Sequence, residues 1–121
     1  MEPLTVVLYQ NDAGTAQALA VSLSQQSTSV HQARSRDDIP VAVARHRADV
    51  LVLDLEKSGL SEVVRLHHEF PDLSIVCTHR LADEELWAEA LNQGAADMCV
   101  PWNTQDIVRS VLRERAHRHA A

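Results

Sequence analysis

The sequence predicts an α/β fold, with a single doubly wound parallel sheet of five strands covered by five helices. Short apolar segments rich in Val, Leu and Ile alternate regularly with segments in which apolar residues recur at helical spacing. Hydrophobic residues make up 45% of the chain but aromatic residues only 3%, so small aliphatic side chains must fill the core. A chain of 121 residues has room for one domain of this kind.

Apolar and β-branched segments mark the predicted strands. The clearest is 49–54, which is apolar on both faces and bounded by Asp49 and Asp54. Such an uninterrupted apolar pattern is typical of a parallel sheet that helices cover on both sides. The predicted strands are 4–9, 29–34, 49–54, 73–78 and 96–100.

A helix is predicted after each strand. Pro40 fits the first turn of the second helix, Pro71 stops the third, and Gly94 closes the fourth. Sites in doubly wound sheets lie where the strands reach their carboxyl ends. The predicted helices are 15–24, 38–47, 61–70, 83–93 and 104–117, and the residues at the strand ends are Gln10, Asn11, Asp12, Asp54, Thr78, His79, Val100 and Pro101.

Charge and composition argue against several classes of protein. The net charge of −6 disfavours direct binding to nucleic acid or to a membrane surface, which normally needs a basic face. No apolar run approaches the length of about 18 residues needed to span a membrane, and no basic-then-apolar leader opens the sequence. Cys77 and Cys99 do not suggest a disulfide scaffold. We therefore expect a cytoplasmic protein.

Several short motifs occur in a characteristic order. Asp54 ends a strand five residues after Asp49, Gly94-Ala95-Ala96-Asp97 precedes the last strand, and Pro101-Trp102-Asn103 follows it, with Asp106-Ile107 beyond. In this order and at this spacing the chain resembles the receiver domain of bacterial response regulators. The resemblance implies a flavodoxin-like sheet with strand order 2-1-3-4-5. It covers a core of about 4–112 within one domain, 1–121, whose segment 113–121 is a basic helix end or a linker.

The resemblance assigns roles to the residues at the strand ends. In this family an aspartate after the third strand is phosphorylated, two acids after the first strand hold Mg²⁺, and a hydroxyl after the fourth strand touches the phosphoryl group. Asp54 matches the phospho-acceptor, and the hydroxyl position falls on Thr78 or His79. The acidic pair falls on Gln10 and Asn11, or on Asn11 and Asp12 after a shift of one residue.

Three positions depart from the family pattern. The phosphate-pairing lysine of the fifth strand falls on Val100, and Lys57 is the single lysine of the chain. Met98 replaces the aromatic residue that reports phosphorylation in many relatives. At most a weak Mg²⁺ site at Asp12 and Asp54 is expected, because amides in place of carboxylates remove negative charge, and no other cofactor is expected.

The departures leave two interpretations of Asp54. It is either a working phospho-acceptor, with Lys57 or His79 supplying the missing cation, or a strand-end acid whose contacts are structural, such as a helix N-cap. We favour an atypical receiver that binds a protein partner or its own output domain, with weakened or lost phosphorylation. A conventional phosphorylated receiver is the alternative, and no second catalytic group supports an enzyme.

A further expectation concerns the face made by the helix 83–93, the fifth strand and the last helix. In many relatives this face mediates dimerisation or docking. Acidic residues lie on the first of these helices and arginines on the last, so a two-fold pairing would bring opposite charges together. The candidate interface residues are Trp87, Trp102, Arg109 and Arg113.

Overall fold

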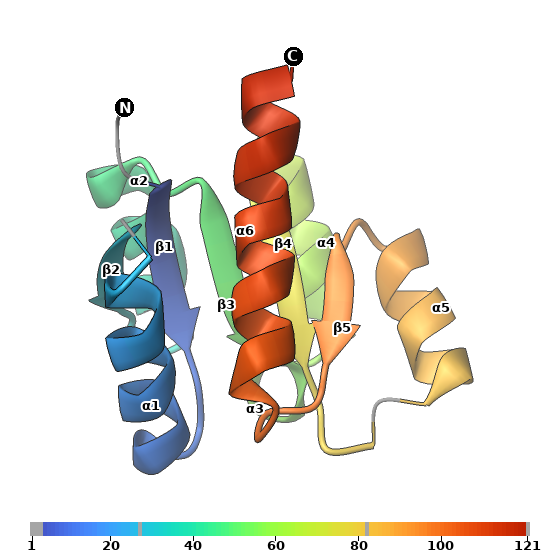
Figure 1. The fold of residues 1–121 in the computed structure, drawn as a ribbon. Helices are drawn as coiled ribbons and strands as arrows, with labels where there is room; N and C mark the ends of the chain where they lie inside the picture. Colours follow the sequence, from blue (N-terminus) through green and yellow to red (C-terminus); the bar gives the residue numbers. More distant parts are fainter. Residues whose placement is uncertain (1–3, 27, 82, 121) are drawn as a thin grey trace.

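The computed structural model describes residues 4–26, 28–81 and 83–120, with side chains as far as Glu114. Its centre is a parallel sheet in the order β2-β1-β3-β4-β5, which confirms the predicted fold class and strand order (Figure 1). The strands are β1 (Leu4–Tyr9), β2 (Thr28–Gln32), β3 (Val50–Asp54), β4 (Ser74–Thr78) and β5 (Asp97–Cys99).

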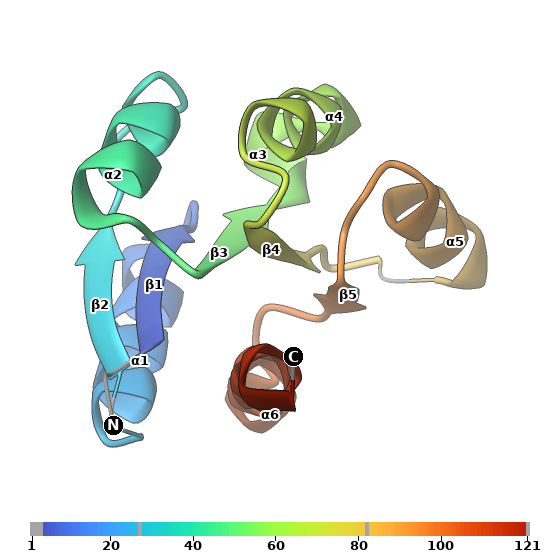
Figure 2. The same cartoon turned by 90° about the horizontal axis from the view of Figure 1, so that it is seen from above.

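Helices cover both faces of the sheet. In the view from above, α1 and α6 lie on one side of the strands, and α2, α3, α4 and α5 lie on the other (Figure 2). The helices are α1 (Ala13–Ser24), α2 (Asp38–His46), α3 (Leu55–Ser58), α4 (Leu60–Glu69), α5 (Glu84–Asn92) and α6 (Thr104–Ala120).

The prediction of five helices was wrong by one, because the described residues form a sixth, the single turn α3. This turn is too short to show a helical period in the sequence. It forms because the Asp54 side chain caps it by accepting the Glu56 N–H. Gly59, at φ +82°, then separates α3 from α4, a conformation that glycine adopts without strain.

The core has two layers, one on each face of the sheet. Alternate residues of β3 belong to different layers, with Leu51 and Leu53 facing α2 and α4, and Val50 and Val52 facing α1 and α6. All four side chains are fully buried. Burial on both faces explains why the strands read as continuous apolar runs.

Element ends differ from the predicted ones by a few residues. The first helix begins at Ala13, two residues earlier than predicted, because Asp12 caps it. The last helix continues past His117 to Ala120, so the basic segment is a helix end as far as the structure describes it. Within the described residues, no helix is both long and apolar enough to cross a membrane.

Candidate functional site

An open pocket of about 600 Å³ lies at the carboxyl edge of the sheet, where the predicted site residues converge. Loops that follow β1, β3, β4 and β5 all contribute to it, as expected for parallel strands that end at one edge. The lining residues are Gln10, Asn11, Asp12, Thr15, Asp54, Glu56, Lys57, Arg80, Pro101 and Trp102.

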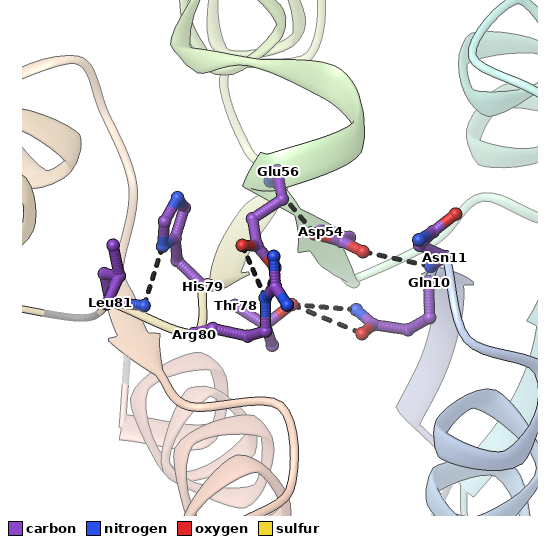
Figure 3. A network of polar contacts seen from close by, with 8 residues as sticks. All are labelled: Gln10, Asn11, Asp54, Glu56, Thr78, His79, Arg80 and Leu81. Carbon is purple, nitrogen blue, oxygen red and sulfur yellow. Dashed lines mark hydrogen bonds and ion pairs between the residues drawn. The ribbon is translucent and has the colours of Figure 1, made fainter.

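Asp54 lies at the floor of this pocket with only 7% of its surface exposed. Its Oδ1 accepts the backbone N–H of Glu56, and its Oδ2 accepts the backbone N–H of Asn11, each at 3.0 Å (Figure 3). The carboxylate therefore fixes two loops, the one after β1 and the one after β3. A carboxylate has about four acceptor positions, so these contacts leave acceptor capacity on the pocket side.

Gln10, which lines the pocket, forms a hydrogen-bonded pair with the buried Thr78. The Gln10 Nε2 donates to Thr78 Oγ1 at 3.1 Å, and the Thr78 hydroxyl lies 3.3 Å from Gln10 Oε1 as a donor (Figure 3). Strand β3, which ends in Asp54, lies between β1 and β4. The Gln10 side chain therefore passes the end of β3 to reach Thr78. The buried Thr78 hydroxyl is thus already engaged by a carboxamide.

The sheet register bears on the choice between Thr78 and His79. Thr78 is the direct register partner of Asp54 on the neighbouring strand. His79 instead accepts the backbone N–H of Leu81 on its Nδ1 and is drawn on the side of that loop away from Gln10 (Figure 3). Thr78 is therefore the residue whose hydroxyl lies beside the Asp54 strand end.

Asp12 uses its carboxylate to cap α1. Its Oδ2 accepts the Thr15 backbone N–H at 2.8 Å and the Thr15 hydroxyl at 2.9 Å. These two hydrogen bonds hold the pKa of Asp12 below its usual value. Asp12 lines the pocket, and both of these hydrogen bonds use its Oδ2 at the start of the helix.

The donor set does not fit the Mg²⁺ site that the fold family implies. Mg²⁺ needs hard, preferably charged oxygen ligands in near-octahedral arrangement. Gln10 is engaged with Thr78, Asp12 caps α1, and Asp54 is the carboxylate that remains at the strand ends. In the described part of the chain, no group of three or more His, Cys, Asp or Glu side chains is placed to hold a metal ion.

Arg80 is a cation of the pocket that the sequence analysis missed. Its Nε contacts Glu56 Oε1 at 2.8 Å and Oε2 at 3.1 Å. The pKa of Arg80 is raised chiefly by this hydrogen-bonded partner, with a smaller contribution from the Asp54 charge. Its place two residues after β4 is a signal that the sequence offered.

Lys57 and the position to which the resemblance assigns the family's lysine, Val100, are placed differently. The Lys57 Nζ lies 4.6 Å above the centre of the Tyr9 ring, at the pocket wall. Val100, at the position of the family's lysine, is partly buried after the short strand β5.

The candidate interface residues fall into two groups. Trp87, Arg109 and Arg113 line a small cavity of about 260 Å³ between α5, β5 and α6, with the buried Met98 in its wall. Trp102, which is 67% exposed, belongs instead to the pocket at the carboxyl edge. Both arginines already have acidic partners, as Arg109 lies 3.0 Å from Asp106 and Arg113 3.6 Å from Asp97.

Cys77 and Cys99 are buried thiols in different layers of the core. Burial raises the pKa of Cys77 to about 12, and burial also raises the pKa of Cys99. A thiol that stays protonated is a poor nucleophile. Both cysteines are free and buried, so the structure agrees with the prediction that they do not form a disulfide scaffold.

Comparison with solved structures identifies the fold. The chain is similar to a response regulator from Thermotoga maritima, with a TM-score of 0.86 and 20% identity over 94% of this chain and 98% of that one. It is also similar to the receiver domain of an HD domain-containing protein from Pseudomonas fluorescens, with a TM-score of 0.85 and 20% identity over 98% and 99% of the two chains.

A third similar structure is the CheX–CheY complex with BeF3 and Mg from Borrelia burgdorferi, with a TM-score of 0.82 and 16% identity over 92% of this chain and 88% of the matched chain. No protein-family model and no curated protein matches the sequence. At these identities the similarity establishes the fold, which is that of receiver domains.

Proposed function

We propose that the protein is an atypical receiver domain of cytoplasmic bacterial signalling. It acts by binding a protein partner, its own output domain or a second copy of itself, and phosphorylation of Asp54 is weakened or lost. It is not an enzyme. The observation that carries this proposal is the Gln10–Thr78 pair, which occupies the hydroxyl beside Asp54.

Charge supports the same conclusion. Transfer of a phosphoryl group to a carboxylate requires positive charge to neutralise the donor and the developing oxyanion. Val100 supplies none, and Arg80 is held by Glu56. A receiver is a two-state element, and a trigger that no longer binds one state better than the other cannot shift its population.

A titration followed by amide NMR tests the proposal. Wild type and Asp54→Ala are each titrated with Mg²⁺ and then with beryllofluoride, a mimic of the phosphoryl group. We expect no specific shifts near Asp12, Asp54 and Thr78 at millimolar Mg²⁺. Shifts in the wild type that vanish in Asp54→Ala would instead show a working phospho-acceptor pocket.

The alternative is a conventional receiver phosphorylated at Asp54 by a histidine kinase. The observation in its favour is that Asp54 faces the pocket, with Thr78 in register and both Lys57 and Arg80 in reach of the same space. The substitution Asp54→Asn separates the two functions. Loss of partner binding or dimerisation in this variant would favour the conventional receiver, and unchanged binding would favour the atypical one.

For the docking face we propose self-association through α5, β5 and α6. Trp87, 45% exposed, is flanked on α5 by exposed glutamates, while Arg109 and Arg113 lie on α6. A two-fold axis would place the acidic helix of one copy against the arginines of the other.

Sedimentation tests this face. Trp87→Ala is expected to weaken self-association, and Trp102→Ala is a matched control, since its indole lies in the other pocket. An unaltered monomer–dimer equilibrium in Trp87→Ala would count against the proposed face. Weakening by Trp102→Ala alone would move the interface to the carboxyl edge.

A further inference from the structure

Away from the carboxyl-edge pocket, two histidine rings lie face to face. His31 of β2 and His46 of α2 stack with their centroids 3.6 Å apart and their planes 4° from parallel. Both side chains are partly buried. The Ser29 Oγ lies 3.2 Å from His31 Nε2, which fixes the ring on the strand side. The contact joins the edge strand of the sheet to the helix that covers it.

The surroundings of this histidine pair disfavour a second proton. Strand β1 and helix α1, which pack against β2, contain no Asp, Glu, Lys, Arg or His. Helix α2 contributes Asp38 at its far end, where the carboxylate accepts a backbone N–H of the β2–α2 loop. Next to His46 the chain carries Arg45 and Arg47, both exposed cations.

The two rings are not equivalent. His46 lies in the last turn of α2, where the negative end of the helix dipole favours a cation. His31 lies on the strand, and its pKa is held below the usual value by burial first and by the charge of His46 second. Protonation of both rings would place two cations one ring thickness apart.

We propose that the His31–His46 stack is a pH-sensitive contact that holds the edge strand β2 against α2 and opens when both rings are protonated. Opening would loosen β2, the edge strand, which among the described residues pairs with β1 alone. An edge strand with unpaired backbone groups is the part of a sheet where acid would act first.

The direction of the pH effect follows from proton linkage. A histidine whose folded-state pKa is lowered takes up its proton more readily in the unfolded chain. The stabilisation is therefore complete above a pH of about 6.5 and is lost as the pH falls below that value. Local opening of β2 should show the same pH range as the titration of His31.

The full chain can be tested by NMR. The ring signals of all histidines are titrated, and amide hydrogen exchange is compared between β2 and the central strand β4 at pH 7.5 and at pH 5.5, after correction for the intrinsic pH dependence of exchange. We expect the His31 ring to titrate at a lower pH than an unperturbed histidine. The amides of β2 should lose protection at pH 5.5 relative to those of β4.

The variant His46→Gln removes one of the two charges and keeps a polar side chain. In this variant His31 should titrate at higher pH, and β2 should keep its protection at pH 5.5. The proposal would be overturned if, in the wild type, the protection of β2 relative to that of β4 is the same at pH 5.5 as at pH 7.5. An unchanged titration of His31 in His46→Gln would also overturn it. If that variant does not fold, the wild-type exchange data alone still decide.

Discussion

The strands β3 and β4 and the strands that flank them, β1 and β5, end at the same edge of the sheet but differ in what they place there. The inner pair ends in Asp54 and Thr78, which are in register and match the acceptor and hydroxyl positions of receiver domains. The flanking strands β1 and β5 are followed by Gln10 and Val100, which carry no charge. The ends of the inner and the flanking strands therefore share one backbone arrangement and differ in the charge that they place at the edge.

The difference shows that two separate physical requirements act at this edge: some side chains there stabilise the fold, and others would be needed only to bind a phosphoryl group or a metal. Asp54 and Thr78 have structural contacts, since one caps α3 and the other bonds to Gln10, so folding alone gives a reason to keep them. A lysine or a second carboxylate at the strand ends would contribute little to folding without a phosphoryl group or metal to bind.

The first prediction compares two consecutive residues of β3. Leu53 is fully buried, so Leu53→Ala should lower the free energy of unfolding by about 2–5 kcal/mol through lost burial and a cavity. Asp54→Ala removes the hydrogen bonds from the Glu56 and Asn11 backbone N–H groups and should cost less, about 1–3 kcal/mol. Urea denaturation measures both. Equal losses would mean that the strand end is as important to folding as the strand interior.

The second prediction restores the lost charges. The triple variant Gln10→Asp, Asn11→Asp and Val100→Lys reinstates the family pattern around the retained Asp54 and Thr78. Two added carboxylates supply the hard ligands that Mg²⁺ prefers, so its affinity should rise at least about tenfold, which corresponds to about 1.4 kcal/mol. NMR titration measures the gain, and Val100→Lys alone is the matched control.

No gain in affinity would contradict the view that the frame of the receiver site is intact. The backbone geometry would then be what prevents Mg²⁺ binding. The flanking strand ends would differ from the inner ones in geometry as well as in charge.

The third prediction concerns the hydrogen bond between Gln10 and Thr78, which joins the end of the flanking strand β1 to the end of the inner strand β4. In Gln10→Ala the buried Thr78 hydroxyl loses its partner, and the variant should lose about 0.5–1.5 kcal/mol of stability. If the carboxamide blocks the pocket, the same variant should bind beryllofluoride better than wild type in the presence of Mg²⁺. Thr78→Val is the control, since it breaks the same bond while removing the hydroxyl. Unchanged binding in Gln10→Ala would show that the carboxamide is no obstacle.

The sequence predicted the frame better than the pocket. The five strands, their order and the helices that cover both faces followed from apolar periodicity and from the family resemblance, because local pattern and burial agree along the whole chain. Helix α3 was missed because a single turn has no period. The Gln10–Thr78 bond joins residues 68 positions apart, and no local pattern encodes such a contact.

The stack of His31 on His46 was missed for the same reason. The two histidines lie on different elements, and neither position is unusual when each element is considered alone. Arg80 differs from these cases, since its place just after β4 put it at the carboxyl edge. A search for every charged residue within two positions of a strand end would have found it.

The smallest effect is expected for Arg80, a cation that follows the inner strand β4, whereas the flanking strand β5 is followed by the uncharged Val100. Arg80 is paired with Glu56, but 71% of its side chain is exposed, so Arg80→Gln should lower the free energy of unfolding only slightly, less than Gln10→Ala does. The loss should shrink further in high salt, because ions screen exposed charges. Urea denaturation at low and high salt measures it, with Lys57→Gln as a control for removing a cation from the same pocket. A loss as large as that of Gln10→Ala that persists in high salt would mean that Arg80 is part of a tighter network with Asp54. The ends of β3 and β4 would then hold a group of coupled charges. Their contribution to stability would be electrostatic as well as structural.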